Sequence, residues 1–407
     1  MYKKNYFLIT FFILLSIFSL LRLYDNTINL DSWQYGEWLI NYQYGFVRRG
    51  VIGEIIYLFS KLFNNNIQLS LFIIISAISL FYYFLSYQFI KDTKLNFIFY
   101  MIIFSPLFYL FFVVISKVGI KKEIIFYIFY LLYLFHLSSK NFSMKRNWKY
   151  MISFPILLLN HEGTFFYLPY IIFPLLCIVK IQKKEFNKLA IQLIALILLS
   201  VLFMIVLYFY KGSTEHVNTI CTSLGKYAPA KCDWWGPINA LSHDIHIAVD
   251  GETNLFFYIF SGYKSYLGLL FYILYSYLPL FIFYKFIYFK KENNFLSVNL
   301  LLIYLFTAFI FSFPLFHLAE DWSRWFSIHF HLLAFLIFFF DRLQLINFKN
   351  IEIFNKINFY LLNKKMKFFI ILLLFYSTTF HHPHFFIKGA KLEFTYYKIF
   401  KKINTHF

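Results

Sequence analysis

The sequence predicts an all-α, polytopic integral membrane protein. Hydrophobic residues make up 60% of the 407 residues, charged residues only 14%, and the mean hydropathy is +0.63. A soluble domain is about half apolar and about a quarter charged. Apolar runs of roughly 20 residues recur along the chain, and a helix of that length crosses a hydrocarbon core of about 30 Å.

The net charge of +19 does not indicate a nucleic-acid partner, because the lysines lie between the apolar runs. Lysines in that position orient the helices and meet anionic lipid. The lysine-rich connections therefore mark the cytoplasmic side of the membrane.

The apolar runs give the expected spans in chain order. They cover residues 6–23, 66–90, 96–116, 123–137, two short limbs within 150–179, 189–210, 265–289, 295–316, 327–340 and 368–380. We expect one transmembrane domain over residues 1–407, with about ten to twelve spans and an uncleaved first helix. Outer-face loops and short re-entrant or interfacial helices complete this fold. The outer turn with Lys117, Lys121 and Lys122 is the one connection that fits the positive-inside rule poorly.

Two outer segments are expected: a first outer loop and interfacial segment over 24–63, and a large outer loop and interfacial segment over 211–263. Within them, residues 51–63 and 254–263 are apolar but too short to span a membrane. Six of the seven tryptophans fall on the outer side: Trp33, Trp38, Trp234, Trp235, Trp322 and Trp325. Since tryptophan belts normally occur at both faces, this one-sided enrichment favours a site on the outer face.

The first outer loop concentrates charge at Asp31, Glu37, Arg48 and Arg49. A pair of arginines suits phosphate or pyrophosphate, because the planar guanidinium donates bidentate hydrogen bonds to oxygen anions. A nearby carboxylate is suited to act as a base toward a hydroxyl acceptor. The alternative is that these are the solvated charges of a wet loop.

A polar break, Asn160-His161-Glu162-Gly163, divides the apolar run 150–179. We expect an outward-facing tip here. Ionisable groups at membrane depth are expensive and usually functional. His161 and Glu162 are therefore candidates for a general base or a ligand of a substrate hydroxyl, the alternative being a tip that only caps itself and contacts water.

A second dense cluster occupies the turn 317–325, which includes Asp321, Trp322, Arg324 and Trp325. If this turn opens a helix, Asp321 and Arg324 share a face at i, i+3 and form a local ion pair. Alternatively, Arg324 between two tryptophans forms a cradle for a sugar and its phosphate, since aromatic faces stack on sugars and the cation meets the anion.

Two cysteines, Cys221 and Cys232, lie in the large outer loop. An outward loop is in an oxidising compartment in most bacteria, so we expect a disulfide. The same loop carries Asp233 and, further on, His243, Asp244 and His246. Their spacing matches no strong metal-ligand pattern, and we expect neither a metal nor another cofactor.

The chain resembles the O-antigen and capsule polymerases of bacterial surface-polysaccharide gene clusters, the Wzy family. The resemblance lies in length, number of spans, aromatic composition and a large outer loop. Two motifs, Gly45-Phe46-Val47-Arg48-Arg49-Gly50 and Asp321-Trp322-Ser323-Arg324-Trp325, resemble those of uncharacterised membrane proteins from such gene clusters. Those polymerases often carry an Arg, ten residues and then a Gly, whereas Phe59 and Ser60 stand at the corresponding positions here. This departure leaves open polytopic glycosyltransferases with a lipid-phosphate sugar donor, which place an acidic residue where Asp31 or Glu37 stands.

Both classes imply that an acceptor hydroxyl attacks, with inversion, a sugar carried on polyprenyl phosphate or pyrophosphate. The implied substrate-binding residues are Glu37, Arg48, Arg49, Trp322, Arg324 and Trp325. The implied catalytic residues are Asp31, His161, Glu162 and Asp321. The implied partners are a polyprenyl-pyrophosphate-linked oligosaccharide, membrane lipid and a chain-length regulator protein, and the implied location is the bacterial inner (cytoplasmic) membrane.

Two other functions remain open. A flippase for lipid-linked oligosaccharides is expected to carry charges along a path at membrane depth and a repeated architecture, whereas the charges here gather on one side and no repeat is visible. A membrane acyltransferase is expected to place its key histidine in a cytoplasmic or membrane-buried site. We therefore expect a polysaccharide polymerase or a related glycosyltransferase.

Overall fold

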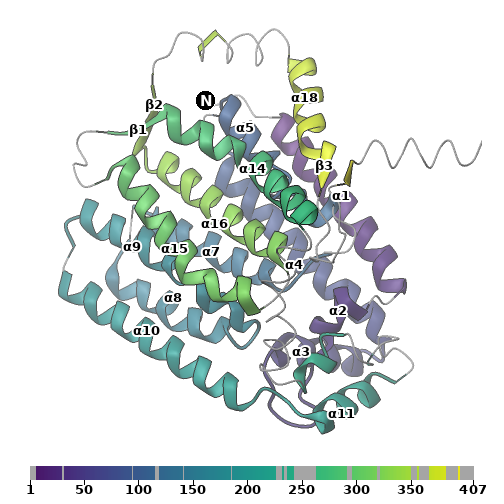
Figure 1. The fold of residues 1–407 in the computed structure, drawn as a ribbon. Coiled ribbons are helices and arrows are strands. Elements are labelled where there is room, and N and C mark those ends of the chain that lie inside the picture. Colours follow the sequence, from purple (N-terminus) through teal and green to yellow (C-terminus); the bar gives the residue numbers. More distant parts are fainter. Residues whose placement is uncertain are drawn as a thin grey trace, which may run out of the picture.

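Helices form most of the described chain (Figure 1). The computed structural model describes residues 6–29, 32–93, 95–114, 119–140, 142–184, 186–225, 232, 236–242, 263–290, 296–318, 321–349, 355–356, 366–381 and 393–394. Within these ranges, seven helices are long and apolar enough to cross a membrane, by length and composition. They are α1 (Tyr6–Asn29), α4 (Ile67–Ile90), η1 with α9 (Glu162–Tyr167 and Pro169–Ile181), α10 (Phe186–Phe209), α14 (Tyr263–Phe286), α15 (Val298–Leu318) and α16 (Trp322–Arg342). The prediction of a mostly helical chain with several helices long and apolar enough to span a membrane is confirmed.

Shorter elements join and flank these helices. They are α2 (Ser32–Leu39), α3 (Gly50–Leu62), α5 (Phe97–Ile103), α6 (Phe111–Val114), α7 (Glu123–Leu137), α8 (Met144–Leu157), α11 (Thr214–Leu224), η3 (Asn239–Leu241) and α18 (Met366–Thr379). Two pairs of very short antiparallel strands are the exception to the all-α prediction: β1 (Ile287–Phe289) with β2 (Ile346–Phe348), and β3 (Phe380–His381) with β4 (Glu393–Phe394).

The expectation of one continuous helix over 96–116 is wrong. The chain forms α5, then a turn over 104–110, then the four-residue helix α6. Pro106 explains the break, because proline has no N–H to donate and disfavours the helical conformation of the preceding residue. The hydroxyl of that residue, Ser105, donates instead to the carbonyl of Ser276 in α14, at 2.8 Å.

The expected division of the run 150–179 is confirmed. Helix α8 ends at Leu157, the chain turns through Asn160 and His161, and η1 leads into α9. His161 caps η1: its Nδ1 accepts a hydrogen bond from the backbone N–H of Gly163 at 3.1 Å. The polar break therefore lies between α8 and the apolar helix α9, within the run that the sequence indicates.

Helix α16 is the most buried of the long helices and packs against α7, α14 and α15. Several of its polar side chains are paired inside the protein, where an apolar environment favours internal hydrogen bonds. His329 Nδ1 lies 3.0 Å from the hydroxyl of Tyr170, and its Nε2 lies 2.6 Å from the hydroxyl of Ser312. The ring of His331 stacks on Tyr127, with centroids 4.4 Å apart. These contacts fix α16 in register with α9, α15 and α7.

The lysine-rich connections gather at one end of the helical body. The pairing of β1 with β2 joins the ends of α14 and α16. Arg342, at the end of α16, lies 3.8 Å from Asp92 and over the rings of Phe89 and Phe135, which brings the ends of α4 and α7 alongside. Figure 1 shows β1 and β2 at this end and α2, α3 and α11 together at the opposite end.

Candidate functional site

A cluster of ionisable side chains lies where α2, α3, α7, α16 and the α8–η1 turn meet. Four segments that are distant in the sequence contribute to it. We call this set the ionic cluster: Glu37, Arg48, Arg49, Lys121, Lys122, Glu123, His161, Glu162, Asp321 and Arg324. The three charged motifs that the sequence indicates therefore converge on a single site.

The loop before α3 presents its two arginines through unusual backbone geometry. Arg49 is the N-cap of α3 and has a φ of 65°, in the left-handed region that a residue with a side chain rarely adopts. Lys122 donates from Nζ to the carbonyl of Arg49 at 2.6 Å and holds it there. At Gly53, an added Cβ would lie 1.8 Å from the carbonyl oxygen of Ile40, so only glycine allows α3 to approach this segment.

The turn that carries Lys121 and Lys122 is held in place by side chains that donate hydrogen bonds to its backbone carbonyl groups. The indole N–H of Trp38, a fully buried side chain, donates to the carbonyl of Ile120 at 2.9 Å. Asn160 donates from Nδ2 to the carbonyl of Lys122 at 3.4 Å. The two lysines therefore point into the protein, although their position before an apolar run indicated a turn that meets lipid or water.

The outer rim of the ionic cluster consists of Arg48, Arg49 and Glu162. Arg49 donates from Nε to Glu162 Oε2 at 2.8 Å and from Nη2 to Oε1 at 2.6 Å, which is bidentate geometry. Arg48 has longer contacts, 3.3 Å from Nη1 to Glu162 Oε1 and 3.4 Å from Nη2 to the carbonyl of Ala240 in η3. These three side chains are 17–25% exposed, more than the rest of the paired groups in the cluster.

Arg48 keeps donor capacity that its neighbours do not use. Among the described residues, its buried Nε has no hydrogen-bond partner. Burial lowers the pKa of Arg48, and the carboxylate of Glu162 partly offsets this effect. A guanidinium is effectively always charged in a protein, so Arg48 is a cation with long, replaceable contacts at the rim.

The interior of the ionic cluster is organised around Arg324. Its guanidinium pairs with Glu123, with Asp321 Oδ2 at 3.1 Å and with Glu37 Oε2 at 3.5 Å. Lys121 Nζ lies 3.7 Å from the other oxygen of Glu37. Burial alone would raise the pKa of Glu37, but Lys121 and Arg324 outweigh it and hold that pKa well below its usual range. Glu37 is therefore ionised and bound between two cations.

Lys122 and His161 are the two groups of the cluster whose protonation is most affected by burial. Burial lowers the pKa of Lys122 from 10.5 to about 7, with Glu37 opposing the shift. Burial lowers the pKa of His161 from 6.5 to about 4, with Glu123 opposing it. His161 is therefore neutral at pH 7. Its Nδ1 accepts from the N–H of Gly163 at 3.1 Å, and its Nε2 lies 3.5 Å from Glu123 Oε1 and 3.4 Å from Arg324 Nη2.

The charges of the ionic cluster balance only when Lys122 is neutral. Five side chains are cationic when Lys122 is protonated, and four are carboxylates. Buried charges are stable only when they are paired, so the excess positive charge favours binding of an anion. The arrangement at Arg48 is suited to an oxygen anion such as a phosphate, because guanidinium groups bind phosphate through two parallel hydrogen bonds.

The two predicted tryptophans take different positions. Trp325 is almost fully buried, and the guanidinium of Arg324 lies 5.3 Å from its ring centroid. Trp322 is half-buried and donates from its indole nitrogen to the carbonyl of Phe316 at 2.8 Å. The cation–π contact of Arg324 is thus made with Trp325. Asp31, the remaining predicted site residue, lies outside the described residues.

Sequence reasoning missed Lys121, Lys122 and Glu123 as site residues. The available signal was the poor fit of this turn to the positive-inside rule, since lysines on the outer side of a membrane protein need another explanation. The structure gives that explanation for Lys121 and Lys122, which face carboxylates and a carbonyl inside the ionic cluster. Lys117 lies outside the described residues.

The predicted disulfide between Cys221 and Cys232 is confirmed, with Cα atoms 6.2 Å apart. It joins α11 to the following loop. Asn41 donates to the hydroxyl of Ser223 in α11 at 3.1 Å, so α11 is also tied to the segment before α3. Six further residues of this loop lie outside the described residues: Asp233, Trp234, Trp235, His243, Asp244 and His246.

Comparison with models of known protein families, with curated proteins and with solved structures gave no match to this chain. The function must therefore be inferred from the chemistry of the ionic cluster. This chemistry combines a partly exposed rim, in which two arginines share one carboxylate, with a buried interior in which Arg324 pairs with three carboxylates.

Proposed function

We propose that this chain is a membrane glycosyltransferase of the surface-polysaccharide polymerase type. It joins polyprenyl-pyrophosphate-linked oligosaccharide repeat units on the outer face of the bacterial cytoplasmic membrane, in O-antigen or capsule synthesis. Ten to twelve spans, a chain-length regulator as partner and the absence of a metal or other cofactor are parts of the same proposal.

The observation that carries the proposal is the geometry of Arg48. It is a cation at the exposed rim of the ionic cluster, its side-chain hydrogen bonds are 3.3 and 3.4 Å long, and its Nε has no partner among the described residues. A pyrophosphate oxygen offers shorter, charge-assisted hydrogen bonds to such a group. We therefore assign Arg48 to the donor pyrophosphate.

The proposed reaction is a displacement at the anomeric carbon of the donor sugar. The acceptor hydroxyl oxygen forms a bond to this carbon, while the bond from the carbon to the pyrophosphate oxygen breaks and its electron pair leaves with the polyprenyl pyrophosphate. The hydroxyl proton passes to a carboxylate, for which we assign Glu162. Arg48 and Arg49 stabilise the charge that develops on the leaving group, which is usually the largest catalytic contribution.

Binding of the donor changes the environment of the proposed base. In the structure Glu162 accepts from both Arg48 and Arg49. When Arg48 turns to the pyrophosphate, Glu162 keeps one cation instead of two. Removing a nearby positive charge raises the proton affinity of a carboxylate, so the base becomes stronger only when donor is bound.

Arg324 has a positioning role in this proposal. Its contacts are with Glu37, Glu123 and Asp321, and it is 8% exposed. His161 also acts inside the cluster, since its Nδ1 accepts from Gly163 and its Nε2 faces Glu123. Both residues keep α7, α16 and the α8–η1 turn in register behind the reacting groups.

A flippase is the main alternative, and the location of the charges argues against it. The ionic cluster gathers at the end of the body that carries α2, α3 and α11 (Figure 1). A transporter is expected to place its substrate site near the middle of the membrane. A transferase that uses lipid-phosphate sugars would bind the donor phosphate at the same rim. It would transfer a single sugar, whereas the polymerase joins whole repeat units.

The test is a deletion of the gene in its native host, complemented by variants and followed by a gel of lipopolysaccharide or capsule. Wild type should restore the ladder of repeat units, and the deletion and Arg48→Ala should collapse it to a single repeat at normal membrane abundance. Arg146→Ala, which removes an exposed arginine from the lysine-rich end, is the matched control and should keep the full ladder.

Two outcomes would contradict the proposal. A normal ladder for Arg48→Ala would remove Arg48 from the reaction. Loss of every repeat unit in the deletion strain would indicate a flippase or an earlier transferase, because a polymerase acts after the first unit has been assembled.

A further inference from the structure

Lys122 is a buried amine directly behind the rim of the ionic cluster. Its side chain is fully buried, and the residue forms the N-cap of α7. Its Nζ donates to the backbone carbonyl of Arg49 at 2.6 Å, and Asn160 donates to its own backbone carbonyl at 3.4 Å. The amine therefore bonds to a neutral group, and this group belongs to one of the two arginines that form the rim.

The carboxylates of the ionic cluster form ion pairs with other cations. In the interior, one arginine, Arg324, pairs with three carboxylates. At the rim, Arg48 and Arg49 both pair with Glu162. Burial in an apolar environment disfavours the charged form of an amine, and a lysine changes its protonation readily when it is buried. The position of Lys122 therefore makes it the amine of the cluster that exchanges a proton most easily.

The charges around Lys122 come from the elements packed against it. Burial lowers the pKa of Lys122 to about 7. The carboxylates of Glu37 in α2, Glu162 in η1 and Glu123 in α7 oppose this effect. The guanidinium of Arg49, before α3, adds to it. Glu37 is also acted on by three further groups of the cluster: Lys121, His161 and Arg324. Since Arg49 and Glu162 are rim residues, a charge added at the rim also acts on Lys122.

We propose that an oxygen anion bound at Arg48 and Arg49 binds together with a proton on Lys122. This inference rests on the proposed function, which places the donor pyrophosphate at the same rim. The negative charge of the anion stabilises the ammonium form of Lys122, and by linkage the ammonium form strengthens binding of the anion. Lys122 is a positioning residue, because its buried amine contacts Arg49 and not the anion.

The hydrogen bond to Arg49 transmits this effect to the arginine pair. A charged donor forms a stronger hydrogen bond than a neutral one, so protonation of Lys122 holds the carbonyl of Arg49 more firmly. Arg49 has a φ of 65°, and such a conformation persists only when its surroundings hold it. The proton and the anion therefore favour the same conformation of the loop before α3.

The test is isothermal titration calorimetry of the purified full chain in neutral detergent, with dimethyl pyrophosphate as the anion. This diester represents the pyrophosphate of the donor and does not itself titrate near neutral pH. Measurements in buffers of different ionisation enthalpy give the number of protons that are taken up for each anion bound.

The expected uptake follows from the coupling between two charges. A unit charge at a separation of roughly 10 Å, with an effective dielectric of about 20, raises the proton affinity of Lys122 on the order of tenfold. From a pKa of about 7, wild type should then take up about 0.4 proton per anion at pH 7, and almost none above about pH 9.5. Lys122→Met should bind the anion without this uptake, and the difference between the two proteins separates Lys122 from His161 and Glu162.

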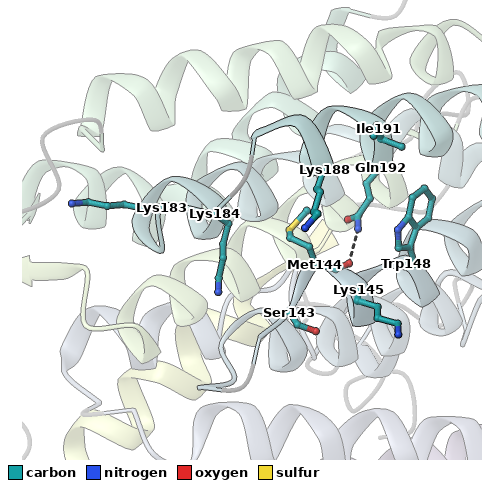
Figure 2. Close-up of a pocket in the computed structure, with 9 residues that line it drawn as sticks. All are labelled: Ser143, Met144, Lys145, Trp148, Lys183, Lys184, Lys188, Ile191 and Gln192. Carbon is teal, nitrogen blue, oxygen red and sulfur yellow. Dashed lines mark hydrogen bonds between the residues drawn. The ribbon is translucent and has the colours of Figure 1, made fainter.

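The matched control removes a lysine from another basic part of the molecule. Lysines also line a pocket at the start of α8 (Figure 2). Helix α8 has 14 residues, a length of about 21 Å, and this pocket lies at the opposite end of it from His161. Lys145→Met, in the lining of the pocket, should take up as many protons as wild type.

The outcomes separate this inference from the proposed function. Binding that Arg48→Ala weakens, but that takes up no proton in wild type, would overturn the inference alone. Equal uptake by wild type and Lys122→Met would also overturn it, since another group would then bind the proton. Absence of binding to wild type, or equal binding to Arg48→Ala, would contradict both, because both require an anion at the rim. If Lys122→Met does not fold, the pH profile of uptake by wild type decides.

Discussion

Lys122 shows how a single buried amine couples the conformation of a loop to protonation. Its Nζ donates to the carbonyl of Arg49, whose left-handed φ of 65° costs of order 1 kcal/mol or more. The same amine is fully buried among Glu37, Arg49, Glu123 and Glu162, and burial lowers its pKa to about 7. Protonation of Lys122 near neutral pH therefore acts on the residue that presents the rim of the ionic cluster.

Lys122→Met should remove part of the pH dependence of stability. Between pH 7 and 10.5 the unfolded chain carries the proton on this lysine and the folded chain does not, so this group makes stability rise with pH through that window. The thermal midpoint of wild type in detergent should therefore rise relative to Lys122→Met between pH 7 and 9. A difference between the two proteins that stays constant over this range would contradict the shifted pKa.

Arg324 should be far more important for stability than Arg48. Truncating Arg324 to Met leaves Glu37, Glu123 and Asp321 without their common cation, and breaking such a buried pair costs about 3–5 kcal/mol. Arg48→Met removes a partly exposed group with long contacts and should cost about 1 kcal/mol or less. Thermal unfolding of the two variants in the same detergent checks this order, and equal losses would refute the division into rim and interior.

The sequence could identify most charged members of the site and the local ion pair of Asp321 with Arg324, which the structure confirms, but not the partners that are distant in the chain. Arg48, Arg49, Glu162 and Arg324 stand out because charge is costly in an apolar chain. Lys121 and Lys122 look like flanking lysines of a membrane helix, because one-dimensional patterns do not show that Trp38 and Asn160 hold their turn inside. Pairing over more than 100 positions, as between Arg48 and Glu162, is a property of the fold alone.

At the scale of elements, α3 is the part that places the rim. It begins at the arginine pair, and Glu54 on its second turn accepts from the backbone N–H of Tyr42 at 2.8 Å, which ties the preceding loop to the helix. A short amphipathic helix after the first span was predictable from residues 51–63, and α3 covers Gly50–Leu62. The break at Pro106 was missed, because the apolar run 96–116 was given more weight than the proline within it.

Gly53→Ala should displace α3 from residue 40 and disturb the rim. The new Cβ would lie 1.8 Å from the carbonyl oxygen of Ile40, which is backbone and cannot move aside alone. Overpacking of this kind costs about 1–3 kcal/mol, and the polysaccharide ladder should shorten because Arg49 moves with the helix. Ile55→Ala, at an exposed position of the same helix, should change stability by less than about 0.5 kcal/mol. Wild-type behaviour of Gly53→Ala would argue against this close approach.

At the scale of the whole molecule, sequence reasoning predicts best that the two ends of the helical body differ: the lysine-rich connections lie at one end and the predicted site residues at the other. Arg342 draws the ends of α4 and α7 to the end of α16, and β1 with β2 joins the end of α14 there. The ionic cluster lies beside α2 and α3, at the other end (Figure 1). The order of the helices around α16 was not predictable, because nearly uniform apolar faces carry no information about which neighbour they pack against.

This polarity predicts which positions a membrane-impermeant maleimide reaches in intact cells. In the proposed orientation, a single cysteine at Tyr44, in the loop before the arginine pair, or at Asn218, on α11, faces outward. A single cysteine at Lys140 or Lys183 faces the cytoplasm. The first pair should label in intact spheroplasts, and the second pair only after permeabilisation. The native cysteines should contribute little, because Cys177 is buried and the other two are disulfide-bonded. Labelling of Lys140→Cys without permeabilisation would show that the orientation is the reverse of the proposed one. The ionic cluster would then face the cytoplasm, and this would contradict the proposal that repeat units are polymerised on the outer face.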